Sequence, residues 1–324
     1  MYDQSPHIRR LFWLGCAPSL AQGSNVFTPS DSPPAQWRER LDELASDNLL
    51  MAWLDDCAAL RLGRYFEALY RVWCERVLDW RILANNLPIR NGSRTLGELD
   101  ILVENRQLNR IEHHELAVKF YLGTSTSEGL RWIGPNRRDR LDLKISRMRD
   151  HQMTLAQTPE AIRVFAKHHL PAPAVSRLVM LGQLFVPYAH GVQSPQSDDL
   201  EAQSLASGCV SGSQLERDQT NIALSLDETA RNTLARLPAC YWHAVHRIPT
   251  SALVNSVVVG KPDWLGTLPS IANPSFVNAQ VLLDTVELNQ RAELVARLTR
   301  DSDGLWREVE RFFLVPKNWP NDLP

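Results

Sequence analysis

The sequence is poor in cysteine, in net charge and in long apolar runs. Its five cysteines are an odd number at wide, irregular spacing without a CxxC pair, which excludes a disulfide framework and a paired zinc motif. No stretch approaches the roughly 20 apolar residues of a membrane-spanning helix, and the N-terminus lacks the long apolar region of a signal peptide. We therefore expect a cytoplasmic protein with no membrane partner, and the sequence identifies no protein partner.

Several motifs of known chemistry are also missing. The sequence has no GxGxxG or GxxxxGK[ST] loop for nucleotide phosphates, no GxSxG for a nucleophilic serine and no HExxH for zinc. What is present is an ordinary globular composition, with 44% hydrophobic and 22% charged residues. The length of 324 residues exceeds that of a usual single domain.

Basic residues gather between Arg131 and Arg149, where six arginines and one lysine occur against two aspartates. Because the formal net charge is only -2, any contact with nucleic acid must be local. The residues that we expect to contact the phosphates of DNA or RNA are Arg131, Arg137, Arg138, Arg140 and Arg147. The alternative is a solvated helix face, the commoner role of a charge run.

The spacing of apolar residues predicts a mixed order of helices and strands. One apolar stripe from Phe66 to Trp80 predicts a helix, and another from Leu141 to Leu155 predicts a second. Alternating or apolar segments with turn residues between them predict strands at 82–89, 97–105, 110–122 and 176–188. Residues 122–137 are expected to form a loop. The order implies an α/β fold in which helices flank a mixed sheet.

Composition predicts four segments along the chain. We expect an N-terminal segment at 1–54, an α/β core at 55–190, a flexible polar connection at 191–220 and a C-terminal α+β extension at 221–324. No chemistry can be read from the extension.

Carboxylates and a lysine follow two of the predicted strands. Because side chains alternate along a strand, Glu98 and Asp100 share one face, and on the next strand Glu115 and Lys119 share one face. If these faces match, Asp100 and Glu115 converge, and two carboxylates beside a lysine suit cleavage of phosphodiester bonds with Mg²⁺ or Mn²⁺. The alternative is the solvent-facing half of two amphipathic strands.

The helices add two supporting candidates. Gln152 lies on the apolar stripe of the second helix, so its amide points toward the sheet, where it either orders Glu115 or bonds to the backbone. Glu67 borders the stripe of the first helix and either supports the site or pairs with the arginine one turn later. His113 and His114 flank Glu115, but adjacent residues of a strand point to opposite faces, so at most His113 can join the site.

The motif GELDIL followed by HHELAVK resembles the core of the PD-(D/E)XK nuclease superfamily. The segment LGRYFEALYRVW resembles the first helix of that superfamily, which often carries an acid, here Glu67. More narrowly, LGRYFE, GELDIL, HHELAVKFYLG, GPNRRDRL and RFFLVPKNWP resemble a bacterial family known only as domain of unknown function 1853, which brings no established activity. The superfamily resemblance covers roughly Leu62 to Tyr188. It implies a restriction-endonuclease-like fold with Asp100 and Glu115 as catalytic metal ligands.

The lysine departs from the superfamily pattern. That pattern separates acid and lysine by one residue, where this sequence has Ala117, and Lys119 lies roughly 13 Å beyond Glu115 along a regular strand. A bulge, or Lys144 from the following helix, would restore the arrangement. The sequence thus favours a divalent-metal-dependent nuclease with Lys119 or Lys144, and leaves open an inactive nuclease-fold module that binds nucleic acid or protein. A small-molecule hydrolase or transferase would need a closed apolar pocket in the C-terminal region.

Overall fold

The computed structural model describes residues 5–31, 33–126, 129–188 and 240–320. The chain forms two compact units. Unit 1 comprises Met1–Lys119 and Asp142–Gly182, and unit 2 comprises Phe120–Leu141 and Gln183–Pro324. The predicted connection at 191–220 lies outside the described residues, and the division into four segments stays a prediction.

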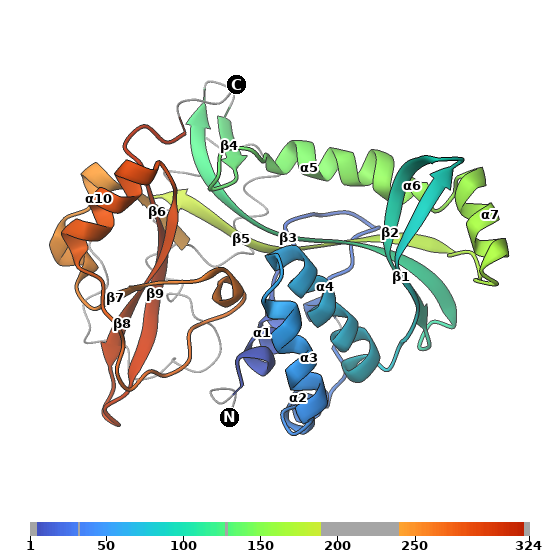
Figure 1. The fold of residues 1–324 in the computed structure, drawn as a ribbon, viewed down its shortest axis with the longest axis horizontal. Helices are drawn as coiled ribbons and strands as arrows, with labels where there is room; N and C mark the ends of the chain where they lie inside the picture. The colour runs from blue at the N-terminus through green and yellow to red at the C-terminus, as the bar shows by residue number, and fades with distance from the viewer. Residues whose placement is uncertain (1–4, 32, 127–128, 189–239, 321–324) are drawn as a thin grey trace. The chain divides into compact units, whose positions relative to one another are not determined.

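Unit 1 combines an N-terminal group of helices, a sheet and a later group of helices (Figure 1). Its helices are α1 (Pro6–Cys16), α2 (Trp37–Leu44), α3 (Asn48–Ala58), α4 (Leu62–Val72), α5 (Leu141–Arg147), α6 (Met153–Leu155) and α7 (Pro159–Lys167), with a short 3-10 turn at Pro29–Asp31. Its strands are β1 (Arg81–Asn91), β2 (Arg94–Asn105) and the first parts of β3 (Arg110–Thr126) and β5 (Val175–Pro187). The strands lie in the order β1-β2-β3-β5, and β3 and β5 continue into unit 2.

The predicted hairpins of unit 1 are present. β1 and β2 pair antiparallel, with Asn91 opposite Arg94 at a two-residue turn, and Gly92 adopts the left-handed conformation (φ 59°) that such turns favour. β2 and β3 also pair antiparallel, from Asn105 opposite Arg110 to Ile101 opposite His114.

Both predicted amphipathic helices form, and each contains a π-helical turn. α4 buries Phe66, Leu69 and Tyr70 and continues as a π turn at Trp73–Val77. The second helix runs through α5, a π turn at Met148–Gln152 and α6. Its predicted stripe is buried at Leu141, Met148 and Leu155, as the heptad-like spacing implies.

β2 keeps the predicted division into one acidic and one core face, with one exception. The core-face residues Leu99, Ile101 and Val103 are buried, and the acidic residues Glu98, Asp100 and Glu104 are half-buried. Leu102, on the acidic face by alternation, is also buried, and it packs with Leu155 and Phe165 of the later helices. The carboxylates of β2 are therefore partly removed from water.

A close approach of β5 to β3 requires a glycine. A Cβ atom added at Gly182 would lie 1.7 Å from the carbonyl oxygen of Lys119, and the φ of Gly182 is 152°. Any larger residue would push the two strands apart.

Unit 2 is the α+β part of the molecule. Besides the ends of β3 and β5, it contains β4 (Gly129–Ile133), β6 (Cys240–Ala244), β7 (Ser256–Val258), α10 (Ala279–Asn289), β8 (Glu293–Arg300), β9 (Trp306–Val315) and 3-10 turns at Val245–Arg247, Thr250–Leu253 and Lys261–Trp264. The strand order is β5-β6-β9-β8-β7, parallel between β5, β6 and β9 and antiparallel thereafter. α10 packs through Leu282 and Val286 on Phe312 of β9.

The predicted loop at 122–137 is partly wrong. β3 extends to Thr126 and pairs antiparallel with β4, from Leu122 opposite Ile133 to Thr126 opposite Gly129. The Gly, Ser and Thr residues of this segment favour turns locally, but the ladder satisfies their backbone groups in a strand.

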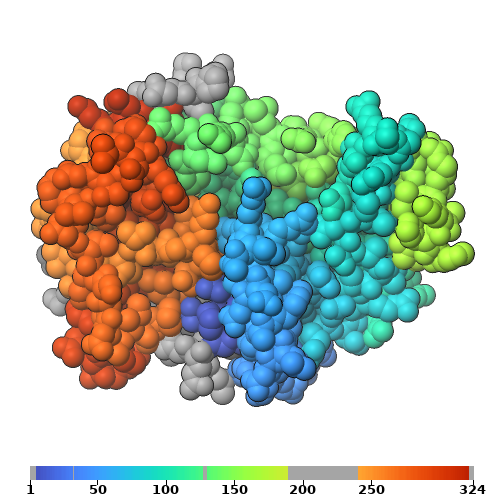
Figure 2. Space-filling model, viewed as in Figure 1, coloured from blue at the N-terminus to red at the C-terminus, as the bar shows by residue number. Residues whose placement is uncertain are grey.

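The ribbons of the N-terminal helices are separated by gaps in Figure 1, and side chains fill these gaps in the space-filling view of Figure 2. No described helix has both the length and the apolar character needed to span a bilayer.

Candidate active site

The candidate site lies where β2 and β3 stop pairing through their backbones. The ladder ends at Ile101 opposite His114, so the next position places Asp100 opposite Glu115. There the Asp100 side chain accepts a hydrogen bond from the Leu116 amide, 2.8 Å from Oδ2. The aspartate thus occupies the place of a backbone carbonyl and is held rigidly against β3.

Asp100 and Glu115, the carboxyl pair, lie within hydrogen-bonding reach of each other. Two carboxyls at this separation form a hydrogen bond only when one of them carries a proton. Burial and then the charge of Glu115 raise the pKa of Asp100 to about 7. Burial likewise raises the pKa of Glu115 to about 7, although the bond from Asp100 opposes that shift. Both carboxyls therefore bind protons more tightly than isolated acids do, and their titrations are coupled.

Gln152 contacts Glu115 directly. Its Nε2 amide donates a short hydrogen bond to Oε1 of Glu115. Gln152 ends the π turn that interrupts the second helix, and such turns often re-aim a side chain at a functional site. Of the two predicted roles of Gln152, the structure shows the one that orders Glu115.

Three buried polar atoms beside the carboxyl pair have no hydrogen-bond partner among the described residues. They are Oε2 of Glu115, Nε2 of His113 and Oε1 of Gln152. The first two lie 3.6 Å apart. Nδ1 of His113 lies 3.2 Å from Oγ of Ser176, and burial lowers the pKa of His113 to about 4, so the imidazole is neutral at physiological pH. Buried polar atoms usually have partners, so this cluster suits a polar ligand.

The predicted acids Glu67 and Glu98 act on the carboxyl pair through their negative charges. The charges of both raise the pKa of Glu115, and that of Glu67 also raises the pKa of Asp100. Glu67 pairs with Arg64, 2.8 Å from Nη1 to Oε2, rather than with Arg71, the arginine one turn later. Arg71 instead lies over the Trp53 ring.

Of the two predicted lysines, Lys144 acts on the carboxyl pair. The charge of Lys144, on α5, lowers the pKa of Glu115 and partly offsets the effect of burial. Lys119 lies on β3, which runs unbroken through Ala117. The Lys119 carbonyl faces Gly182.

The predicted arginines are divided between the two units. Arg131, Arg137, Arg138 and Arg140 belong to unit 2, and Arg147 belongs to α5 in unit 1. Arg137 donates to Oε1 of Gln290, 3.2 Å away, and Arg138 and Arg147 are exposed. Their contact with nucleic acid stays a prediction.

The carboxyl pair supplies some of the oxygen ligands that a hard cation needs. Within the described residues, no three His, Cys, Asp or Glu side chains stand together as a metal site. Mg²⁺, however, is commonly held by one or two carboxylates and completes its shell with water. Asp100 and Glu115 supply that number, and a cation would relieve the repulsion that raises their pKa values.

The sequence did not reveal Arg64, Asn86 or Ser176 as neighbours of the site. The pairing of Arg64 with Glu67 follows the i,i+3 spacing of a helix and could have been found. Asn86 and Ser176 join the site through strand pairing, which no local pattern reports.

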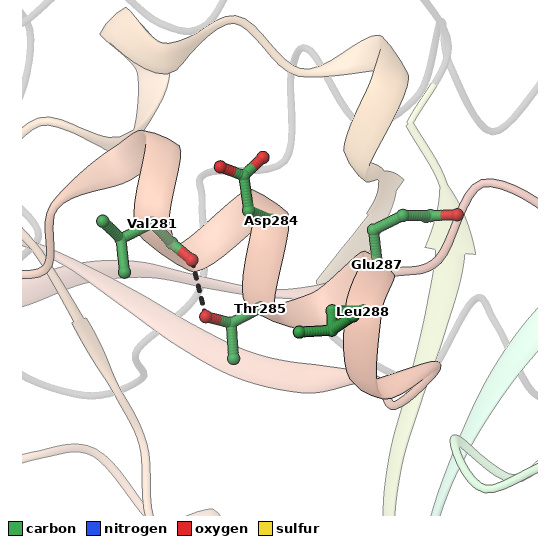
Figure 3. Close-up of a pocket in the computed structure, with 5 residues that line it drawn as sticks. All are labelled: Val281, Asp284, Thr285, Glu287 and Leu288. Atoms are coloured by element: carbon green, nitrogen blue, oxygen red, sulfur yellow. Dashed lines mark hydrogen bonds between the residues drawn. The ribbon is translucent and has the colours of Figure 1, made fainter.

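A pocket on α10 offers no alternative catalytic site. It is lined by Val281, Asp284, Thr285, Glu287 and Leu288 (Figure 3). Leu288 is 85% exposed, and Oγ1 of Thr285 donates to the Val281 carbonyl of its own helix. This open helix surface is not the closed apolar pocket that a small-molecule enzyme would need.

The fold and the carboxyl pair define a mixed α/β protein with a partly buried acidic site on one sheet. The family described as Domain of unknown function (DUF1853) matches residues 9–315, so the chain belongs to that family. No curated protein and no solved structure matches the chain.

Proposed function

We propose that the protein is a divalent-metal-dependent nuclease with a restriction-endonuclease-like core, and that the carboxyl pair holds Mg²⁺ or Mn²⁺. The observation that carries the proposal is the position of Asp100 opposite Glu115 on adjacent strands, where the Leu116 amide holds Asp100 and the Gln152 amide holds Glu115. Two buried carboxyls with a common proton are stable as anions only beside a cation. The resemblance of GELDIL and HHELAVK to the PD-(D/E)XK nucleases supports the same reading.

Each neighbour has a definite role in this proposal. Asp100 and Glu115 hold the ion, which when bound lowers the pKa of a water and polarises a phosphate. Gln152 fixes the orientation of Glu115, as an outer hydrogen-bond partner does for a metal ligand. Lys144 is the cation that positions the attacking water, and Arg131, Arg137, Arg138, Arg140 and Arg147 contact the nucleic-acid backbone.

A second candidate is a nuclease-fold module that binds nucleic acid or protein without cleaving it. The residue that favours this candidate is Ala117, which stands where the superfamily pattern has a lysine. Because fold resemblance alone does not establish activity, a cleavage assay is needed to distinguish the two candidates.

The test is nicking of supercoiled plasmid DNA in Mg²⁺ or Mn²⁺ by the full-length protein and by Asp100→Asn, Glu115→Gln and the control Asp79→Asn. Asp79 is an exposed aspartate that pairs with exposed Arg106, so its variant should match the wild type. We expect cleavage by wild type and control, and loss of at least about a hundredfold in the two site variants. Equal cleavage by Asp100→Asn would refute the site, and plasmid binding without cleavage would favour the inactive module.

The lysine assignment has its own test. Cleavage should fall in Lys144→Ala and persist in Lys119→Ala. Cleavage that survives both substitutions would remove lysine from the mechanism.

A further inference from the structure

Arg64 of α4 lies at the edge of the acidic site and makes two side-chain hydrogen bonds there. Its Nη1 donates to Oε2 of Glu67 at 2.8 Å and to Oδ1 of Asn86 at 2.5 Å. The Arg64 side chain is 50% exposed. A guanidinium has five N–H donors in a rigid plane, and these two bonds use both donors of one nitrogen. Within the described residues, Nε and Nη2 of Arg64 have no hydrogen-bond partner.

Asn86 adopts an unusual backbone conformation at this point. Its φ is 51°, in the left-handed region, although it lies inside β1. Left-handed backbone is unfavourable for most side chains, and Asn tolerates it best after Gly. Such residues gather at functional sites because the surrounding structure must hold them in place.

The strand register places Asn86 beside the carboxyl pair. Asn85 is opposite Ile101 and Leu87 is opposite Leu99, so Asn86 is opposite Asp100. Asn86, Asp100 and Glu115 therefore occupy neighbouring positions on three adjacent strands. The amide of Asn86 holds the guanidinium of Arg64 at the end of this row.

Two cations interact electrostatically with the acidic site. The charges of Glu98 and Asp100 act on Arg64, whereas Lys144 acts on Glu115. A phosphodiester that approached four carboxyl groups would be repelled unless cations offset their charge. Arg64 presents a planar pair of donors, which suits the two oxygens of a phosphate.

We infer that Arg64, held by Asn86 and Glu67, binds a backbone phosphate of the nucleic acid on the Asp100 side of the carboxyl pair. This inference rests on the proposed nuclease function. It adds a substrate contact that lies outside the basic segment at 131–149, from a residue of the LGRYFE motif to which the sequence assigned no role.

The test measures binding of a short fluorescein-labelled DNA duplex to the full-length protein by anisotropy, in Ca²⁺ and over a range of salt. The variants are Arg64→Gln, Arg64→Lys and Asn86→Gly, since glycine keeps the left-handed backbone and removes the amide. Arg163→Gln is the matched control. Arg163 pairs with Glu160 at 2.9 Å on α7, Glu160 also accepts from Asn91, and the Arg163 side chain is 66% exposed.

We expect Arg64→Gln to weaken binding about tenfold and to lower the salt slope by about one. Arg64→Lys should recover part of the affinity, because lysine keeps the charge but lacks the planar donors. Asn86→Gly should weaken binding about threefold, because it removes the amide that holds the guanidinium of Arg64. Affinity equal to that of Arg163→Gln would overturn the inference. The circular dichroism spectrum of every variant should match that of the wild type. If Arg64→Gln does not fold, the affinity of Arg64→Lys is compared with that of Arg163→Gln instead, and equal affinities would overturn the inference.

Metal titration separates this inference from the proposed function. Arg64→Gln should bind Mn²⁺ at least as tightly as the wild type, because a nearby positive charge has been removed. A wild-type protein that binds neither Mn²⁺ nor the duplex would refute the proposed function and this inference together. Binding of both by the wild type, with no change in Arg64→Gln, would refute this inference alone.

Discussion

Two buried glutamates three residues apart on β3 behave in opposite ways. Glu112 and Glu115 are each 1% exposed. Glu112 accepts hydrogen bonds from His114 at 3.0 Å, Arg110 at 2.7 Å and Asn105 at 2.9 Å, and Arg177 lies 3.6 Å away. Glu115 has the amide of Gln152 and the carboxyl of Asp100 instead.

The difference shows that burial alone does not determine the pKa of a carboxyl. Burial pushes the pKa of both groups upward, but the bonds from His114 and Arg110 bring that of Glu112 down to about 2. Glu115, beside a second acid, has a pKa raised to about 7. A buried carboxylate with a full set of hydrogen-bond donors stabilises the fold. A buried carboxyl without such donors is a candidate for binding a cation or exchanging a proton.

The largest expected effect is that of Glu112→Gln on stability. The substitution leaves His114 and the two arginines without their buried counter-charge, and loss of one partner from such a network costs about 3–5 kcal/mol. Glu104→Gln is the control, because Glu104 pairs with the 61% exposed side chain of Arg81 and should change the free energy of unfolding by less than about 1 kcal/mol. Urea denaturation measures both, and equal small losses would abolish the contrast between the two glutamates.

The next effect concerns the pH dependence of stability. Because the carboxyl pair binds protons more tightly in the folded than in the unfolded chain, it stabilises the fold at acidic pH, and this contribution is lost as the pH rises through about 7. Glu112, with a lowered pKa, stabilises the fold above its unfolded pKa and loses that contribution as the pH falls through about 2. His113, with a pKa lowered to about 4, acts in the opposite direction over the same range, because the fold gains stability as this imidazole loses its proton in the unfolded chain. The decline due to the carboxyl pair, between about pH 4 and pH 7, is therefore measured as the difference in thermal unfolding between wild type and Asp100→Asn.

Asp100→Asn should remove part of that decline. An asparagine oxygen can still accept from the Leu116 amide, and the buried charge is gone. We expect the free energy of unfolding at about pH 8 to rise by about 1–3 kcal/mol. Destabilisation by Asp100→Asn at this pH, with the decline unchanged, would contradict the shared-proton account.

The smallest expected effect is that of Gln152→Met. Removal of one amide donor to a buried carboxyl should cost about 0.5–1.5 kcal/mol, since the remaining volume is conserved. Gln157→Met, at an exposed position shortly after the same helix, is the control and should be near neutral. A loss in Gln152→Met no larger than in the control would mean that the amide does not order Glu115.

The sequence predicts the parts of this arrangement that follow from local periodicity. Strand alternation predicts that Asp100 and Glu115 face the same side, and the apolar stripe predicts the inward direction of Gln152. The opposite faces of His113 and His114 follow from the same rule, as their partners Leu102 and Ile101 show.

The remaining features depend on contacts that are distant in sequence. The local sequence contains half of what distinguishes Glu112 from Glu115. Arg110 and His114 lie two residues from Glu112 on β3, whereas Asn105 and Arg177 come from β2 and β5. The left-handed backbone of Asn86 and its bond to Arg64 join β1 to α4, two elements separated by the π turn at Trp73–Val77. β4 forms where local composition favours a turn, since cross-strand pairing outweighs weak turn preference.

The most direct test of the carboxyl pair is calorimetric titration of Mn²⁺ near pH 7 in two buffers that differ in ionisation enthalpy. If Asp100 and Glu115 share a proton that a cation displaces, wild-type protein should release up to about one proton per bound ion. Asp100→Asn should bind far more weakly and release none. Tight binding without proton release, or the same binding by Asp100→Asn, would contradict the account.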